Sequence, residues 1–173
     1  MSLSEPLILT LKLDRPAFEH LDDLRQQHFP PARNIVPAHI TLFHSLPGDA
    51  QPTIQQTLQD ACATTSVLPL RFPTLRFLGG GVAIEVECSA LMQLRRQLAT
   101  VWSTWLSAQD RQPYRPHLTI QNKVPSAQAR QLYDQLSRSW TPLDGQGIGL
   151  LLWRYLGGPW ELVETFAFVE QPA

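Results

Sequence analysis

Two short segments of the sequence repeat one pattern of chemically useful side chains. Residues 39–42 read His-Ile-Thr-Leu and residues 117–120 read His-Leu-Thr-Ile, and each segment begins within two residues of a proline. Alternate side chains of an extended strand share a face, so each segment places His and Thr on one side and two aliphatic residues on the other. The repetition predicts two strands whose His/Thr faces converge on one small site.

Two imidazoles and two hydroxyls indicate proton transfer at a phosphoryl group. Histidine has an ordinary pKa of about 6.5, so one copy can accept a proton while the other donates one, which predicts a bell-shaped pH profile with limbs near neutrality. A threonine hydroxyl can donate to a phosphoryl oxygen that gains charge in the transition state. In an in-line displacement His39 and His117 lie on opposite sides of phosphorus, and either can be the base, depending on the direction of reaction.

The paired His-x-Thr segments resemble the motifs of the two-histidine (2H) phosphoesterase superfamily, whose best-known branch is the bacterial 2'-5' RNA ligase and cyclic phosphodiesterase family. The resemblance implies that the catalytic residues are His39, Thr41, His117 and Thr119. It implies opening of 2',3'-cyclic phosphates, on RNA ends or small nucleotides, to 2'-phosphates, and the reverse joining of RNA ends through a 2'-5' linkage. It also implies a bilobal fold with a central cleft.

Further residues near the motifs are candidates for substrate contacts. Phe43 follows Thr41 on the expected cleft face, where its ring can stack on a base, although a core position is an equally good interpretation. Some RNA-handling branches of the family place a basic residue closely after the second motif, whereas here Gln-Asn precedes Lys123. Arg115 and Arg154 are therefore expected to supply positive charge, with solvated surface arginines as the alternative.

The remaining histidines and the cysteines give weaker signals. His44 lies five residues after His39, so strand alternation predicts the opposite face and a structural or exposed role. No carboxylate or cysteine completes a usual ligand set with His39, His44 and His117, so neither metal nor cofactor is expected. Cys62 and Cys88 are isolated, which predicts small buried hydrophobic residues.

Composition narrows the class of protein. A chain of 173 residues fits one domain, 1–173, that buries a proper core. Its 14 Lys+Arg against 15 Asp+Glu give a net charge of −1, whereas proteins that track long nucleic acids normally carry a basic excess. A small cyclic nucleotide or an RNA end is therefore the favoured partner. The balanced charge and self-contained core predict a monomer.

The elements that must position the motifs alternate between strands and helices. The predicted order begins with strand 7–13, a helix capped by Asp14, the first motif strand and a helix through Ile54 and Leu58. Strands 67–77 and 82–87 follow, joined at 79–81, with Pro69 and Pro73 making part of the first an edge or irregular strand. A helix capped by Ser89 comes next, with Leu91, Leu94, Leu98, Val101 or Trp102, and Trp105 buried, and then the second motif strand, a helix from Ser126, and strands 147–156 and 160–169. No dinucleotide-binding or P-loop fingerprint follows any strand.

The predicted fold is therefore α+β, with two similar lobes related by a pseudo-twofold axis. Each lobe is a small, mostly antiparallel sheet with helices outside, and the motif strands line the cleft between the lobes. The apolar run 7–13 is too short for a signal peptide or membrane span, which predicts a cytoplasmic protein without membrane contact. The alternative to an enzyme is a non-catalytic module that holds a nucleotide or RNA end in the same cleft.

Overall fold

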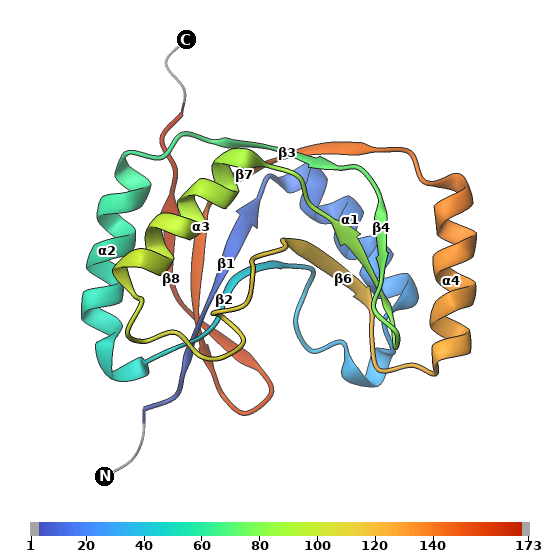
Figure 1. The fold of residues 1–173 in the computed structure, drawn as a ribbon, viewed down its shortest axis with the longest axis horizontal. Helices are drawn as coiled ribbons and strands as arrows, with labels where there is room; N and C mark the ends of the chain where they lie inside the picture. The colour runs from blue at the N-terminus through green and yellow to red at the C-terminus, as the bar shows by residue number, and fades with distance from the viewer. Residues whose placement is uncertain (1–3, 171–173) are drawn as a thin grey trace.

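The computed structural model describes residues 4–170, and its strands form two antiparallel sheets (Figure 1). Residues 1–3 and 171–173 of the predicted domain lie outside this range. The larger sheet has the order β2 (Ile40–Leu46), β1 (Leu7–Leu13), β7 (Leu143–Tyr155) and β3 (Leu68–Phe72), with β8 (Trp160–Ala167) also paired to β7. The smaller sheet has the order β4 (Leu75–Phe77), β5 (Val82–Glu85) and β6 (His117–Gln121).

Four α-helices accompany the sheets within residues 4–170. They are α1 (Arg15–His28), α2 (Gln51–Ala63), α3 (Ser89–Val101) and α4 (Ser126–Ser139). Helix α2 contacts β7 and β8 of the larger sheet, α4 contacts β4 and β5 of the smaller sheet, and α1 contacts both β6 and β7 (Figure 1). No helix in the described part of the chain is long and apolar enough to cross a membrane. The α+β class with two antiparallel sheets is confirmed, although the lobes are unequal.

Strand β7 organises the larger sheet. One edge pairs with β1 from Leu7↔Arg154 to Leu13↔Gly147, and the other edge pairs with β3 near its start and with β8 near its end. The strand begins at Leu143, earlier than the predicted 147. The prediction missed this start because the residues that follow Leu143 are polar or glycine and show no apolar alternation. They pair with β3 all the same, so tertiary pairing decides the boundary.

The prediction of one strand over 67–77 is wrong. The chain forms β3 and β4 instead, separated at Pro73 and Thr74, and the two strands belong to different sheets. Proline fixes φ and offers no N–H to a ladder, so the strand ends where Pro73 stands. This short segment is one of the covalent links between the lobes, and the predicted hairpin between β4 and β5 follows it.

Two details of α3 also differ from the prediction. Its N-cap is Cys88, whose sulfur accepts a hydrogen bond from the Leu91 amide at 3.4 Å, and Ser89 is the first helical residue. Trp105 lies beyond the helix and is 37% exposed, whereas Trp102 at the helix end is buried. The helix stops before the apolar pattern does, so Trp105 does not belong to the buried stripe.

Candidate active site

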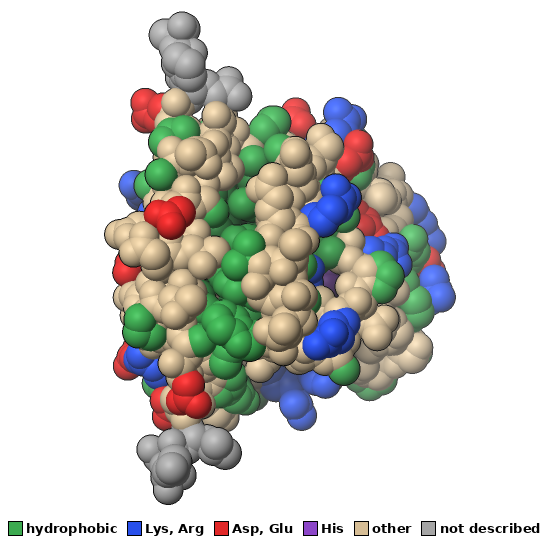
Figure 2. All heavy atoms as spheres, turned by 60° about the vertical axis from the view of Figure 1, so that its left-hand side comes forward, with side chains coloured by type: hydrophobic (Ala, Val, Ile, Leu, Met, Phe, Trp, Pro, Cys, Tyr) green, Lys and Arg blue, Asp and Glu red, His purple; other side chains and the backbone are tan. Residues whose placement is uncertain are grey.

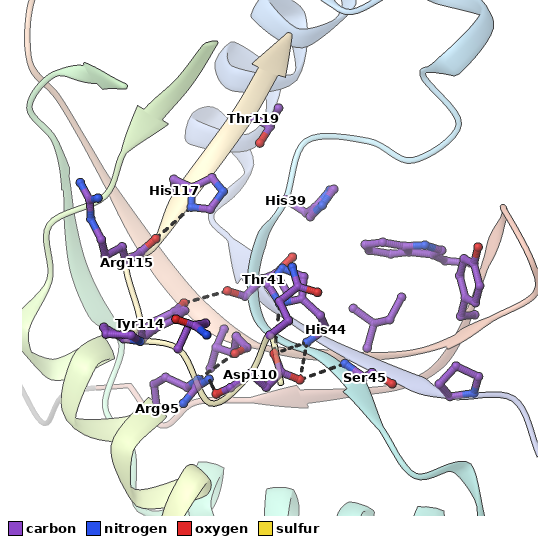
Figure 3. A pocket seen from close by; sticks show the side chains of 18 of the residues that line it. His39, Thr41, His44, Ser45, Arg95, Asp110, Tyr114, Arg115, His117 and Thr119 are labelled. Atoms are coloured by element: carbon purple, nitrogen blue, oxygen red, sulfur yellow. Dashed lines mark hydrogen bonds and ion pairs between the residues drawn. The ribbon is translucent and has the colours of Figure 1, made fainter. Parts of the chain in front are cut away.

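The two motif strands bring their functional side chains to one cavity. β2 is the edge strand of the larger sheet and β6 is the edge strand of the smaller sheet, and the two strands contact each other. His39, Thr41, His117 and Thr119 all line a cavity of about 650 Å³ between them (Figure 3). The aliphatic residues between them, Ile40 and Leu118, are fully buried on the other face. Period-two alternation therefore holds through both motifs.

Each motif histidine is held by the backbone in the same way. The Nδ1 atom of His39 lies 2.8 Å from the carbonyl oxygen of Pro37, and the Nδ1 atom of His117 lies 2.9 Å from that of Arg115. A carbonyl oxygen can only accept, so the His39 contact favours the tautomer with hydrogen on Nδ1. Nδ1 of His117 also lies 3.2 Å from Nη1 of Arg76, which can only donate, so the two neighbours of this atom favour opposite tautomers. The Nε2 atom of each ring is then left to take or give a proton.

An ion pair between Arg76 and Glu85 lies next to His117. Arg76 contacts both carboxylate oxygens of Glu85, at 2.6 and 2.7 Å, and its Nη1 atom lies 3.2 Å from Nδ1 of His117. These hydrogen bonds hold the pKa of Glu85 below its ordinary value against the opposing effect of burial. Arg76 was missed in the sequence, although the hairpin about residues 79–81 brings its strand beside that of Glu85.

Both catalytic candidates are less basic than free histidine. Burial is the main cause that lowers the pKa of His39 to about 4, and the charges of Arg25, His44 and His117 act in the same direction against the Pro37 carbonyl. Burial also lowers the pKa of His117; Arg76 adds to this effect, while the Arg115 carbonyl and Glu85 oppose it. Burial therefore favours the neutral form of both rings in the free protein.

A β-bulge in β2 changes which side chains face the cavity beyond Thr41. Thr10 pairs with Thr41 and Leu9 with Phe43, so β2 contains an extra residue at Leu42. Leu7 then pairs with Leu46, so a second bulge with one more extra residue lies at His44 and Ser45. Phe43 is fully buried and packed edge-on against Trp102, so of its two interpretations the core position is the one observed and the cleft-face position is not. His44 is exposed, as expected, but lines the cavity instead of facing away from it.

Asp110 holds the second bulge, at His44 and Ser45, in place. Its buried carboxylate accepts hydrogen bonds from the His44 amide at 2.9 Å and the Ser45 amide at 3.0 Å, and it lies 3.1 Å from Nδ1 of His44 (Figure 3). Burial acts to raise the pKa of Asp110, but these hydrogen bonds outweigh it and the pKa is lowered. No local sequence signal connects Asp110 with a strand that lies more than sixty residues earlier.

The two predicted substrate-binding arginines occupy different places. Arg115 lines the cavity and its side chain is 68% exposed, with Nη2 3.5 Å from Glu85. Arg154 does not line the cavity, because its guanidinium pairs with Glu161 and donates to Gln51 at 2.8 Å. The next residue of β7, Tyr155, faces the cavity in its place. Strand alternation thus contradicts the predicted site role of Arg154.

Two buried arginines anchor the backbones of the motif strands. Arg95 of α3 donates to the carbonyl oxygen of Leu42 in β2 at 2.8 Å, and Arg25 of α1 donates to that of Thr119 in β6 at 2.8 Å. Each helix therefore holds the motif strand of the opposite half of the chain. Trp160 completes the cavity wall, with its ring 4.8 Å from the ring of His39. None of these three residues was identified from the sequence.

Basic side chains give the cavity a positive character. Arg76, Arg95 and Arg115 line it, and Asp110 is the acidic residue in its wall. Figure 2 shows a histidine side chain at the bottom of a hollow, with Lys and Arg side chains around the opening. Within residues 4–170, no group of three or more His, Cys, Asp or Glu side chains is placed to hold a metal ion. An anionic ligand therefore fits the site.

Comparison with known proteins places this architecture in a family. A sequence model of the 2'-5' RNA ligase superfamily matches residues 13–159, which include both His-x-Thr motifs. The chain belongs to the 2'-5' RNA ligase superfamily. Its resemblance to 2H phosphoesterases is thereby confirmed, and membership supports a phosphodiesterase or ligase type of activity. No curated protein sequence matches the chain significantly.

Solved structures share the fold of this superfamily member at low sequence identity. TT0787 of Thermus thermophilus superposes with a TM-score of 0.70 at 17% identity, covering 96% of this chain and 100% of its own. LigT of E. coli in the apo form gives a TM-score of 0.64 at 16% identity, covering 97% and 99%. LigT complexed with 3'-AMP gives 0.60 at 16% identity, covering 96% and 99%.

Proposed function

We propose that the protein is a phosphodiesterase that opens 2',3'-cyclic phosphates of RNA ends or small nucleotides to 2'-phosphates without a metal ion. With a 5'-hydroxyl end in place of water as the attacking group, the same step joins RNA through a 2'-5' linkage and releases the 3'-hydroxyl. The observation that carries the proposal is the convergence of His39, Thr41, His117 and Thr119 on one cavity from two facing edge strands. A cavity of about 650 Å³ suits a nucleotide.

The proposed reaction uses both histidines at once. One imidazole takes a proton from the attacking water as its oxygen bonds to phosphorus, and the other gives a proton to the 3'-oxygen as the P–O3' bond breaks. Thr41 and Thr119 donate hydrogen bonds to the non-bridging oxygens, whose charge grows in the transition state. Arg76 and Arg115 line the same cavity and add positive charge for this state.

The structural neighbours suggest the class of ligand for this proposal. LigT of E. coli was crystallised with phosphate, with 3'-AMP and with ATP. As part of the proposal, the cavity of this protein likewise binds a nucleotide, with its phosphoryl group between His39 and His117. The positive lining of the cavity favours an anion there.

The test is incubation with a 2',3'-cyclic nucleotide in the presence of excess chelator. We expect the nucleoside 2'-phosphate as product, identified by chromatography against 2'- and 3'-phosphate standards, at a rate that the chelator leaves unchanged. Tight binding without product would favour the non-catalytic module. Loss of activity in chelator, or formation of the 3'-phosphate, would contradict the proposed reaction.

A further inference from the structure

A second concave surface adjoins the catalytic cavity. This surface, called here the aromatic groove, has a volume of about 480 Å³ and an apolar lining that includes Phe18, Val36, Ile148, Leu151, Trp153 and Trp160. His39 and Trp160 line both the groove and the cavity, so they form the wall shared by the two. A molecule held at His39 can therefore extend from one space into the other.

A row of rings leads from the cavity into the groove. The ring of His39 lies 4.8 Å from that of Trp160, which lies 5.9 Å from that of Trp153. The Trp153 indole N–H donates to the hydroxyl of Thr10 at 2.9 Å, and Thr10 itself is buried. The polar atom of Trp153 is thus satisfied within the protein, and the half-buried ring is fixed as an apolar wall.

The charge of the groove is positive. Lys12 and Arg15 line it, and no carboxylate does. Arg15 is paired with Glu19 at 2.7 Å, whereas no ion pair of Lys12 is found between residues 4 and 170. Lys12 therefore offers an ammonium group to a ligand whose remainder is flat and apolar. Aromatic walls with a neighbouring cation are the usual combination for the bases and backbone of single-stranded nucleic acid.

We propose that the aromatic groove binds the base of a second nucleotide, so that an oligoribonucleotide end is preferred to a mononucleotide. The inference rests on the proposed function, because that function places the reacting phosphoryl group beside His39. The second base packs against Trp153 and Trp160, and the phosphodiester that joins the two nucleotides contacts Lys12. Stacking on a ring tolerates every base, so the preference concerns length and not sequence.

Equilibrium binding of two reaction products tests the groove directly. Isothermal titration calorimetry compares adenosine 2'-phosphate with the diadenosine ApA that carries a terminal 2'-phosphate. We expect the dinucleotide to bind about 5- to 150-fold more tightly, the range that one stacked base supplies. Trp153→Leu should reduce this ratio to about twofold or less, while Trp105→Leu, which changes an exposed tryptophan outside the groove, should keep the ratio of the unmodified protein.

A second variant covers the case in which Trp153→Leu does not fold. Lys12→Gln should reduce the dinucleotide advantage and make it less dependent on salt, because one phosphate contact is lost. Equal affinity of the unmodified protein for the two products would overturn the inference, as would a full advantage retained in both variants. Turnover of the diadenosine with a terminal 2',3'-cyclic phosphate is measured separately: its absence alongside a dinucleotide advantage in binding refutes the proposed function and leaves the groove supported.

Discussion

The two motif histidines have matching backbone contacts but different neighbours. His39 lies against the ring of Trp160, and burial lowers its pKa to about 4. His117 lies beside Arg76 and Glu85, whose charges act on its pKa in opposite directions while burial lowers it. Two titratable groups in different environments suit a reaction in which one group accepts a proton and the other donates one.

The pH dependence of kcat/KM should be bell-shaped and centred on the acidic side of neutrality. The free protein has one histidine pKa of about 4 and a second that lies below the ordinary 6.5, and kcat/KM reports these ionisations as values of the coupled pair. The structure thus moves the expected limbs down from neutrality. Rates with a 2',3'-cyclic nucleotide between pH 3.5 and 8, on the order of ten points, measure both limbs.

Arg76→Met is the matched variant for this profile. Removing the guanidinium raises the pKa of His117, and the Glu85 carboxylate left without its partner raises it further. The limb that belongs to His117 should therefore move to higher pH. Arg138→Met, at an exposed position of α4, should leave the profile in place. A maximum above pH 7 in the unmodified protein, or no shift in Arg76→Met, would contradict these assignments.

Substitution of the motif residues should separate proton transfer from charge stabilisation. His39→Ala and His117→Ala should each lower turnover by about 10²- to 10⁴-fold, and Thr41→Ala and Thr119→Ala by about 10- to 10³-fold. The double histidine variant should lose less than the product of the single effects, because the two rings act in one step. His20→Ala on the exposed face of α1 is the control. Full turnover of folded His39→Ala would end the two-histidine mechanism.

At the scale of the element, the β2 bulge at Leu42 decides the composition of the site. Without it, alternation would carry Phe43 to the cavity and turn His44 away. With it, Phe43 enters the core and His44 reaches the cavity. The second bulge leaves the amides of His44 and Ser45 without strand partners. Both amides donate to the buried Asp110 carboxylate instead.

Asp110→Ala should therefore destabilise the protein by about 2 to 4 kcal/mol at pH 7, because buried N–H groups lose a charged acceptor. The native pKa of Asp110 is lowered, so its contribution is present above the unfolded pKa near 3.8 and is lost as pH falls below that value. Urea unfolding at pH 7 and at about pH 3 checks both statements. Asp60→Ala, on the exposed side of α2, should change stability by less than about 0.5 kcal/mol.

The sequence predicted what depends on local patterns and failed where distant residues decide. The motif strands, the Asp14 cap and the hairpin at residues 79–81 each have a signal within a few positions, and the structure has all of them. The cleft-face interpretation of Phe43 failed because β2 has an extra residue between Thr41 and Phe43 where it pairs with β1, and no local pattern predicts this irregularity. The Arg154 prediction failed because the phase of β7 is set by its pairing with β1. The domain extent 1–173 and the monomeric state stay predictions.

At the scale of the whole molecule, a helix from each half of the chain binds the motif strand of the other half. Arg25 precedes the first motif yet binds the backbone of β6, and Arg95 precedes the second motif yet binds the backbone of β2. Both side chains are buried, and each also donates a second hydrogen bond, Arg25 to Asn34 and Arg95 to Asp110. The spacing of His39 and His117 across the cavity therefore depends on contacts made between the halves.

Arg25→Met and Arg95→Met should each destabilise the protein by about 2 to 4 kcal/mol, because buried carbonyl oxygens lose their donors. Each should also lower turnover by roughly 10²-fold where the protein remains folded, since a displaced strand misplaces its histidine. Chemical unfolding and steady-state kinetics on the same samples measure the two effects. Arg138→Met again serves as the surface control, and an unchanged kcat in both folded variants would show that the strands keep their spacing without these anchors.

The place of β7 in the larger sheet has a consequence for synthesis on the ribosome. β1 emerges well before its long partner β7, which begins only at Leu143. Strands β4, β5 and β6 lie between residues 75 and 121 and can pair much earlier. Protease treatment of chains stalled before Leu143 should therefore find the smaller sheet protected and β1 cleavable, so that the first motif acquires its final shape only after β7 has emerged.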